Sequence, residues 1–224
     1  MSRLRTCCAT LISAITAAAT LFVAPTLVTG IGIPSASAAC PDVEVIFARG
    51  RLEPPGAGQI GNAFVSGLRS KTGKNINLYS VQYPADNQVD IGANDMSQRI
   101  QSTAATCPNT RIVLGGYSLG AAVTDVVLAV PMGFMGFKNP LPGDMSDHIA
   151  AVAVFGNGSQ WVGPLSNFNP VYGDRTIELC HGDDPICNPT DPNNWQDYWP
   201  QHLAPAYIGA GMVDQAVDFV AGRL

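Results

Sequence analysis

The sequence predicts an α/β fold, a three-layer sandwich in which helices cover both faces of a central, mostly parallel five-stranded sheet. Short, continuous apolar runs alternate with segments of helical periodicity along residues 39–224. Continuous apolar runs are typical of strands buried on both faces, and helices between such strands indicate parallel connections. One run leads directly into a Gly-Tyr-Ser-Leu-Gly pentapeptide at residues 116–120. About 185 residues suit one domain with a sizeable core.

The first half of this domain alternates strand and helix. Ile60, Phe64 and Leu68 recur at helical spacing and predict one apolar face. Pro84 ends the second expected strand, because proline cannot donate a backbone hydrogen bond. The predicted elements are a strand over 43–47, a helix over 60–68, a strand over 76–83 and a helix over 95–106.

The second half repeats the pattern around the pentapeptide. An apolar, β-branched run precedes the pentapeptide, and residues 121–130 after it contain neither proline nor glycine. Near the end of the chain, Val213, Val217 and Val220 predict an amphipathic helix. The predicted elements are a strand over 111–115, a helix over 118–130, strands over 149–155 and 176–180, and a helix over 212–223.

Residues 1–38 are predicted to be a secretory signal peptide, and residues 39–224 to be the single domain. Arg3 and Arg5 form a basic start, an apolar stretch rich in Ala and Thr follows, and Ala36-Ser37-Ala38 gives a cleavage pattern. The protein is therefore expected to be secreted, and extracellular or cell-wall associated. A retained membrane anchor and lipid attachment at Cys40 are the alternatives. The first lacks a basic stop-transfer flank, and the second lacks the usual aliphatic residue before the cysteine.

Charge and cysteine content narrow the range of partners. The chain has 12 basic and 17 acidic residues, a formal net charge of −5 and no basic cluster. This balance argues against nucleic acid and against electrostatic binding to anionic membranes. Four cysteines lie outside the signal peptide, namely Cys40, Cys107, Cys180 and Cys187. In a secreted chain they are expected to form disulfides, and four cysteines allow three pairings.

Ser118, in the middle of the pentapeptide, is the predicted nucleophile. In a nucleophile elbow the serine sits at a strained turn between a buried strand and a helix, with glycines on either side to avoid collisions. A serine hydroxyl attacks efficiently only when a base removes its proton, and the base needs an acid to hold its tautomer. The alternative is an ordinary turn serine without a catalytic role, which the placement between a strand and a helix disfavours.

Three histidines compete for the role of base, and the sheet topology separates them. In a parallel sheet the site lies beyond the C-terminal ends of the strands. His148 precedes the 149–155 strand, so it falls at the opposite edge. His181 lies on the correct edge but between two cysteines and beside acidic neighbours. His202, in a loop before the last helix, gives the order serine, acid, histidine and is the predicted general base. The acid is Asp183 or Asp184.

Four segments together resemble the cutinase family, above all the secreted cutinase-like serine esterases of mycobacteria and related actinobacteria. The resemblance covers nearly all of residues 39–224. The segment Cys-His-Gly-Asp-Asp-Pro-Ile-Cys is the most specific motif. The matching segments are Phe-Ala-Arg-Gly at 47–50, the pentapeptide at 116–120, the motif at 180–187, and His202-Leu203.

The resemblance implies a cutinase-like α/β-hydrolase that cleaves carboxylic esters and needs no metal and no cofactor. It selects Asp184 as the orienting acid, because the family's catalytic aspartate lies three residues before the second cysteine of this motif. It also implies the disulfides Cys40–Cys107 and Cys180–Cys187. The acidic residues show no calcium-loop spacing, which agrees with the expected absence of metal.

The predicted oxyanion hole consists of the backbone N–H groups of Leu119 and Arg51. The residue after the nucleophile supplies one donor. The family usually has glutamine at position 119, but a backbone donor survives that change. At position 51 the family commonly has serine or threonine, whose hydroxyl also helps. Arg51 keeps only the N–H, so we expect activity that is reduced or redirected towards other esters.

Two aromatic or apolar segments are candidates for shaping substrate preference. One follows the 118–130 helix and is predicted either to form an acyl-chain wall with transient lipid contact or to pack into the side of the domain; its large side chains are Met132, Phe134, Met135 and Phe137. The other, with Trp195 and Trp199, lies before His202. It is expected to brace the histidine rather than to line the cleft.

The predicted function is a secreted, monomeric serine esterase that acts on short- to medium-chain esters, lipids or polyester through an acyl-enzyme on Ser118. Alternatives within the same class are a phospholipase A or lipase, or an acyltransferase, with the same triad. An alternative from another class is a non-catalytic cell-surface binding protein on a hydrolase scaffold. The change at Arg51 is the only support for that reading, and the complete set of Ser118, Asp184 and His202 opposes it.

Overall fold

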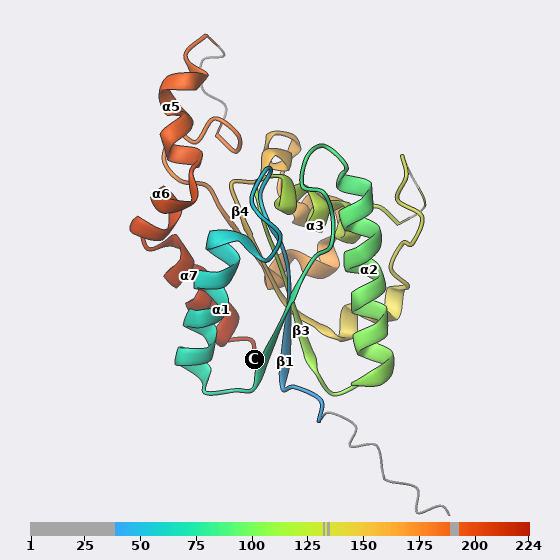
Figure 1. Ribbon diagram of the computed structural model, residues 1–224. Coiled ribbons are helices and arrows are strands. Elements are labelled where there is room, and N and C mark those ends of the chain that lie inside the picture. Colours follow the sequence, from blue (N-terminus) through green and yellow to red (C-terminus); the bar gives the residue numbers. More distant parts are fainter. Residues whose placement is uncertain (1–38, 132, 134, 189–192) are drawn as a thin grey trace, which may run out of the picture. The chain divides into compact units, whose positions relative to one another are not determined.

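Five parallel strands form one sheet in the order β2-β1-β3-β4-β5 (Figure 1). The computed structural model describes residues 39–131, 133, 135–188 and 193–224. The sheet is parallel throughout, where the sequence had predicted a mostly parallel one. Its strands are β1 (Val43–Ala48), β2 (Ile76–Ser80), β3 (Arg111–Tyr117), β4 (Ile149–Phe155) and β5 (Thr176–Leu179).

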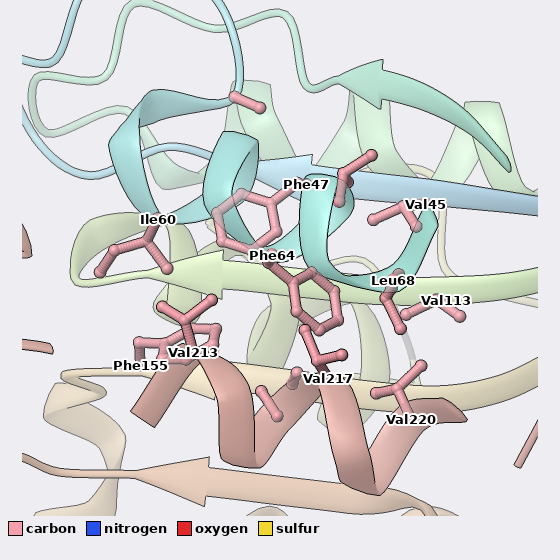
Figure 2. Close-up of a cluster of buried hydrophobic side chains, with 14 of the residues drawn as sticks. Val45, Phe47, Ile60, Phe64, Leu68, Val113, Phe155, Val213, Val217 and Val220 are labelled. Carbon is pink, nitrogen blue, oxygen red and sulfur yellow. The ribbon is translucent and has the colours of Figure 1, made fainter. Parts of the chain in front are cut away.

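Helices cover both faces of the sheet, so the three central strands β1, β3 and β4 are buried on each side. On one face α1 (Gly58–Thr72) and α7 (Met212–Ala221) pack over Val45 and Phe47 of β1 (Figure 2). On the other face α2 (Val89–Thr106) and α3 (Leu119–Ala129) pack over Ile46 of the same strand. Successive strand residues point to opposite faces, which explains why the central strands are largely apolar without alternation. The predicted three-layer arrangement is confirmed.

Shorter elements complete the chain and position its loops. They are η1 (Gly143–Asp147), η2 (Gly158–Val162), α4 (Leu165–Phe168), η3 (Pro170–Arg175), α5 (Trp195–His202) and α6 (Ala204–Gly209). In the described residues no helix is both long and apolar enough to cross a bilayer. The predicted signal peptide lies outside the described residues.

Several element boundaries differ from the sequence prediction. Helix α2 begins at Val89, six residues earlier than expected, and β2 ends at Ser80, three residues earlier. The segment before His202, expected to be a loop, is the helix α5 despite Pro200 inside it. Trp195 and Trp199 lie four residues apart on that helix with ring centroids 5.6 Å apart, and this contact supports the helical turn.

Two disulfides join separate parts of the domain. Cys40–Cys107 ties the segment before β1 to the end of α2, with Cα atoms 5.6 Å apart. Cys180–Cys187 closes a loop after β5, with Cα atoms 5.8 Å apart. This is the pairing that the family resemblance implied.

Gly120 allows the start of α3 to approach the end of β1. A Cβ atom at this position would lie 2.0 Å from the carbonyl oxygen of Ala48. At Gly116 a Cβ would lie 2.1 Å from the carbonyl oxygen of Gly120. Backbone atoms cannot yield as flexible side chains can, so both positions require glycine.

We predict that Gly120→Ala lowers the free energy of unfolding by about 3 kcal/mol or more, because overpacking against backbone leaves no room to relax. Urea unfolding followed by circular dichroism measures this. Gly209→Ala is the matched control in α6, where a Cβ would meet nothing within 4 Å. Equal stability of the two variants would show that the close approach is not required.

Candidate active site

Ser118 occupies the turn between β3 and α3. Its backbone has φ 55° and ψ −119°, which is a strained conformation for a residue other than glycine. The strain is maintained because Tyr117 ends a buried strand and Leu119 starts a helix directly after the serine. This geometry is that of a nucleophile elbow, in which the serine Oγ projects above the sheet.

His202 and Asp184 complete a continuous chain of hydrogen bonds that starts at Ser118. The Nε2 atom of His202 lies 2.8 Å from the Oγ atom of Ser118, and its Nδ1 atom lies 2.7 Å from Oδ2 of Asp184. The histidine ends α5 and is 3% exposed, while the aspartate lies in the Cys180–Cys187 loop and is fully buried. Three distant segments thus meet at the C-terminal edge of the sheet.

Asp184 is buried but accepts enough hydrogen bonds to remain ionised. Its Oδ1 accepts the N–H of Ile186 at 2.8 Å, and its Oδ2 accepts from His202 and from the hydroxyl of Tyr207. Burial raises the pKa of this carboxyl, but the hydrogen bonds from His202 and Tyr207 outweigh it and hold the pKa below its usual value. An ionised acid at this position fixes the tautomer of the imidazole.

The other candidates for acid and base do not reach Ser118. Asp183 is exposed beside the buried Asp184. The ring of His181 lies against Tyr207, with centroids 5.8 Å apart, and its backbone N–H bonds to the Tyr207 hydroxyl. His148 directly precedes β4, at the opposite edge of the sheet.

Two tyrosines contact the site and were not predicted from the sequence. The ring of Tyr117 stacks on the ring of His202, with centroids 5.3 Å apart, and its hydroxyl donates to the His202 backbone carbonyl. Tyr207, fully buried in α6, donates to Asp184 and accepts the N–H of His181 at 3.2 Å. The position of Tyr117 beside Ser118 was a usable signal. No motif marks Tyr207, because only folding brings α6 against the disulfide loop.

Ser118 opens into a cleft of about 670 Å³ whose walls are mainly apolar. Leu52, which is 78% exposed, lies at its rim together with Trp199 and Leu203. The ring of Trp199 also lies 5.0 Å from the ring of His202. This residue therefore contacts the histidine, as expected, and in addition lines the cleft.

The two expected oxyanion donors both line this cleft. Leu119 is the first residue of α3, so its N–H has no partner within the helix and carries the positive end of the helix dipole. Arg51 lies in the turn after β1. Glu53 shapes that turn, because its carboxylate accepts the N–H of Gly50 at 2.7 Å and its carbonyl accepts Nε of Arg49 at 2.8 Å.

The segment after α3 only partly fits the expected lipid contact. Phe137 is 1% exposed and belongs to the apolar core that α2 and α3 share with the sheet, which fits the alternative of packing into the domain for this residue. Met135 is 82% exposed. Neither lines the cleft at Ser118. Met132 and Phe134 lie outside the described residues.

Within the described ranges, no group of three or more His, Cys, Asp or Glu side chains is arranged to hold a metal ion. A nucleophile, a base and an ionised acid in hydrogen-bond contact can carry out acyl transfer.

Comparison with known sequences places this geometry among known proteins. The family model described as Cutinase matches residues 39–224. A Mycobacterium tuberculosis protein named Probable carboxylesterase Culp2 is 66% identical over 216 residues, covering 93% of this chain and 94% of that protein. Phospholipase Culp4 of the same species is 50% identical over 218 residues, covering 96% of this chain and 90% of that protein.

Solved structures agree on the fold. The Trichoderma reesei cutinase in complex with a phosphonate inhibitor aligns with a TM-score of 0.63 at 29% identity, covering 82% of this chain and 76% of that one. The catalytic core domain of acetyl xylan esterase from the same species aligns with a TM-score of 0.64 at 21% identity, covering 83% of this chain and all of that one, 100%. The predicted α/β-hydrolase fold is confirmed.

A second buried carboxyl, Asp125, lies on α3 behind the site. Burial raises its pKa to about 6, although the hydrogen bond from Asn157 and the nearby Ser159 act in the opposite direction. Asn157 donates to its Oδ2 at 2.8 Å, while Oδ1 has no hydrogen-bond partner among the described residues. The folded protein therefore binds a proton here at pH values where the unfolded chain has lost it.

We predict that this proton makes stability depend on pH. The stabilisation by the proton on Asp125 is complete below the ordinary aspartate pKa of 3.8 and is lost as the pH rises through about 6. From pH 4 to pH 7 the wild type should therefore lose roughly 3 kcal/mol of unfolding free energy that Asp125→Asn, which has no such proton, retains. Urea unfolding at a series of pH values measures the difference, and parallel pH curves for the two proteins would contradict it.

Proposed function

The chain belongs to the cutinase family, and on that premise we propose that it is a serine esterase that hydrolyses carboxylic esters through an acyl-enzyme on Ser118. One observation carries the proposal, namely the unbroken hydrogen-bond chain from the Ser118 hydroxyl through His202 to Asp184. Each member is held by a different element, so the alignment is a property of the folded domain.

In the proposed first step, Oγ of Ser118 attacks the ester carbonyl while Nε2 of His202 takes the hydroxyl proton. The ionised Asp184 stabilises the imidazolium that forms. Collapse of the tetrahedral intermediate breaks the bond to the alcohol oxygen, and His202 returns its proton to that oxygen. In the second step water attacks the acyl-enzyme with the same base, which releases the acid and restores Ser118.

The proposed oxyanion donors are the N–H groups of Leu119 and Arg51. Each such donor typically lowers the barrier by about 3–4 kcal/mol. The position of both residues on the cleft of Ser118 supports this role. Since Arg51 supplies no hydroxyl, the hole has one donor fewer than one with serine or threonine at this position.

Lipid esters are a second candidate substrate class, and the apolar rim of the cleft favours them. Leu52 and Leu203 are exposed there although they are large and apolar. The relative named Phospholipase Culp4 supports the same candidate. An alcohol in place of water in the second step would make the protein an acyltransferase. A non-catalytic binding protein does not require the aligned Ser118, His202 and Asp184.

We also propose that the protein is secreted as a monomer after removal of residues 1–38. The two disulfides are compatible with an extracellular protein, because disulfides persist in oxidising compartments. Mass spectrometry of the mature protein tests the cleavage. A mature chain that still carries residues 1–38, or a lipid on Cys40, would contradict it.

We predict that Ser118→Ala lowers kcat for p-nitrophenyl butyrate by roughly 10⁴-fold or more, because the nucleophile is lost. The same change should abolish labelling by a fluorophosphonate probe. Ser66→Ala is the matched control on the exposed surface of α1 and should keep both activities. Folded wild-type protein that neither hydrolyses the ester nor takes the label would overturn the proposed function.

We predict that Tyr207→Phe lowers kcat roughly tenfold while KM changes little, because Asp184 loses a donor that orients it without any contact to substrate. Tyr198→Phe, on α5, is the control and should keep kcat. Steady-state kinetics at several pH values, together with urea unfolding, separates the effect from a loss of stability. A variant that is less stable but has wild-type kcat would assign Tyr207 a structural role alone.

A further inference from the structure

Helix α3, which begins directly after Ser118, carries an apolar stripe that the rest of the fold leaves partly uncovered. The partly exposed positions of the helix and its C-cap are Leu119, Ala122, Val126, Ala129 and Val130. They are spaced three or four residues apart, with the last two adjacent, so they lie on one helix face. Most other positions of α3 are buried against the sheet and α2.

The stripe borders three hollows in succession. The cleft at Ser118 is lined by Leu119 and Ala122. A hollow of about 150 Å³ is lined by Val126 and Ala129. A third, of about 520 Å³, is lined by Ala129 and Val130. The three hollows therefore follow the helix from its first residue to its last.

Neighbouring hollows adjoin one another. The second and third share Ala129, Val130 and Phe168 as lining residues. The first is lined by Gly158 and the second by Ser159, which are consecutive in η2. Across the second hollow, the wall opposite α3 is formed by η2 and α4.

This opposite wall is open and mostly apolar. Gly158 and Gly163 have no side chains to fill the space, and Leu165 and Phe168 of α4 supply apolar surface. Phe168 is 51% exposed at the far end. Asp125 and Ser159 are the polar side chains that line the middle hollow. Asp125 is buried and hydrogen-bonded to Asn157, so Val126 presents the accessible surface of α3 there.

The direction of the stripe fits the acyl half of an ester. His202 must protonate the leaving alcohol, so the alcohol lies on the His202 side of Ser118. The acyl chain then extends to the other side, past the N–H of Leu119 that holds the oxyanion. That is where the stripe begins.

We propose that the three hollows form one groove that binds the acyl chain of the substrate ester along α3, from Ser118 towards Val130. The inference rests on the proposed function and names its substrate class, which is esters of long, unbranched fatty acids. The eleven steps from Leu119 to Val130 rise about 16 Å, the length of an extended chain of roughly twelve carbons. Continuity with the cleft at Ser118 selects this occupant over a second copy of the chain or a lipid surface.

Two variants narrow the groove beyond the cleft, namely Val126→Lys in the second hollow and Ala129→Trp between the second and third. Each should lower the ratio of kcat/KM for p-nitrophenyl laurate to that for p-nitrophenyl butyrate at least tenfold. Both substrates are used below their micellar concentrations. Ile91→Lys is the matched control, because Ile91 is exposed on helix α2 and lines none of the three hollows.

Binding of the product gives a second readout that does not depend on turnover of the long ester. Sodium laurate should inhibit butyrate hydrolysis competitively, with an inhibition constant at least tenfold weaker in Ala129→Trp than in the wild type. Retained butyrate turnover shows that each variant is folded.

The outcomes separate the groove from the proposed function. Serine-dependent butyrate turnover with an unchanged laurate-to-butyrate ratio in both variants overturns the groove and leaves the esterase standing. Butyrate turnover that survives Ser118→Ala overturns the esterase and the groove with it. A wild-type dimer that becomes monomeric in Val126→Lys, as measured by sedimentation, assigns the stripe to contact between copies and also overturns the groove.

Discussion

The site depends on one steric constraint, the contact of backbone with backbone between the start of α3 and the end of β1. At Gly120 a Cβ atom would lie 2.0 Å from the Ala48 carbonyl oxygen and 2.6 Å from that of Arg49. This contact leaves the residue between β3 and α3 no relaxed conformation, so Ser118 is held at a positive φ. The same contact brings the turn after β1 beside the helix start, which is why Arg51 and Leu119 line one cleft. The nucleophile and the proposed oxyanion donors are therefore positioned by the same backbone contact.

Two buried carboxyl groups show how differently one fold treats the same chemical group. Asp184 accepts three hydrogen bonds, and its pKa is lowered despite burial. Asp125 has an oxygen without a partner among the described residues, and burial raises its pKa to about 6. The number of donors that reach the carboxylate decides the sign of the shift, because each donor offsets part of the lost hydration. Asp184 thus keeps a permanent charge beside the imidazole that needs it. Asp125, which has too few donors, lowers the stability of the fold when it ionises.

Local sequence patterns were sufficient to predict the strands and the nucleophile turn, because the signals for these features lie within a few consecutive residues. Topology then selected His202 over His148, since strand direction alone separates the two edges of the sheet. The choice of Asp184 over Asp183 needed the family resemblance, because adjacent aspartates in one loop look alike to any local rule. Helix α5 and the hydrogen bond from Tyr207 to Asp184 could not be predicted from the sequence. Both arise from contacts of aromatic side chains with segments that only the folded chain brings together, such as the ring of Trp199 against His202 and the Tyr207 hydroxyl against Asp184.

The Cys40–Cys107 disulfide also determines at which edge of the sheet Ala39 lies. Cys40 lies just before β1, and Asp42 accepts the N–H of Arg111 at the start of β3. Ser118 lies at the other end of that strand, where α3 begins. Because the strands are parallel, Ala39 and Cys40 lie at the edge of the sheet opposite the cleft. A bead, resin or display scaffold attached at Ala39 would therefore leave the cleft facing solvent, which favours immobilisation through this end of the protein.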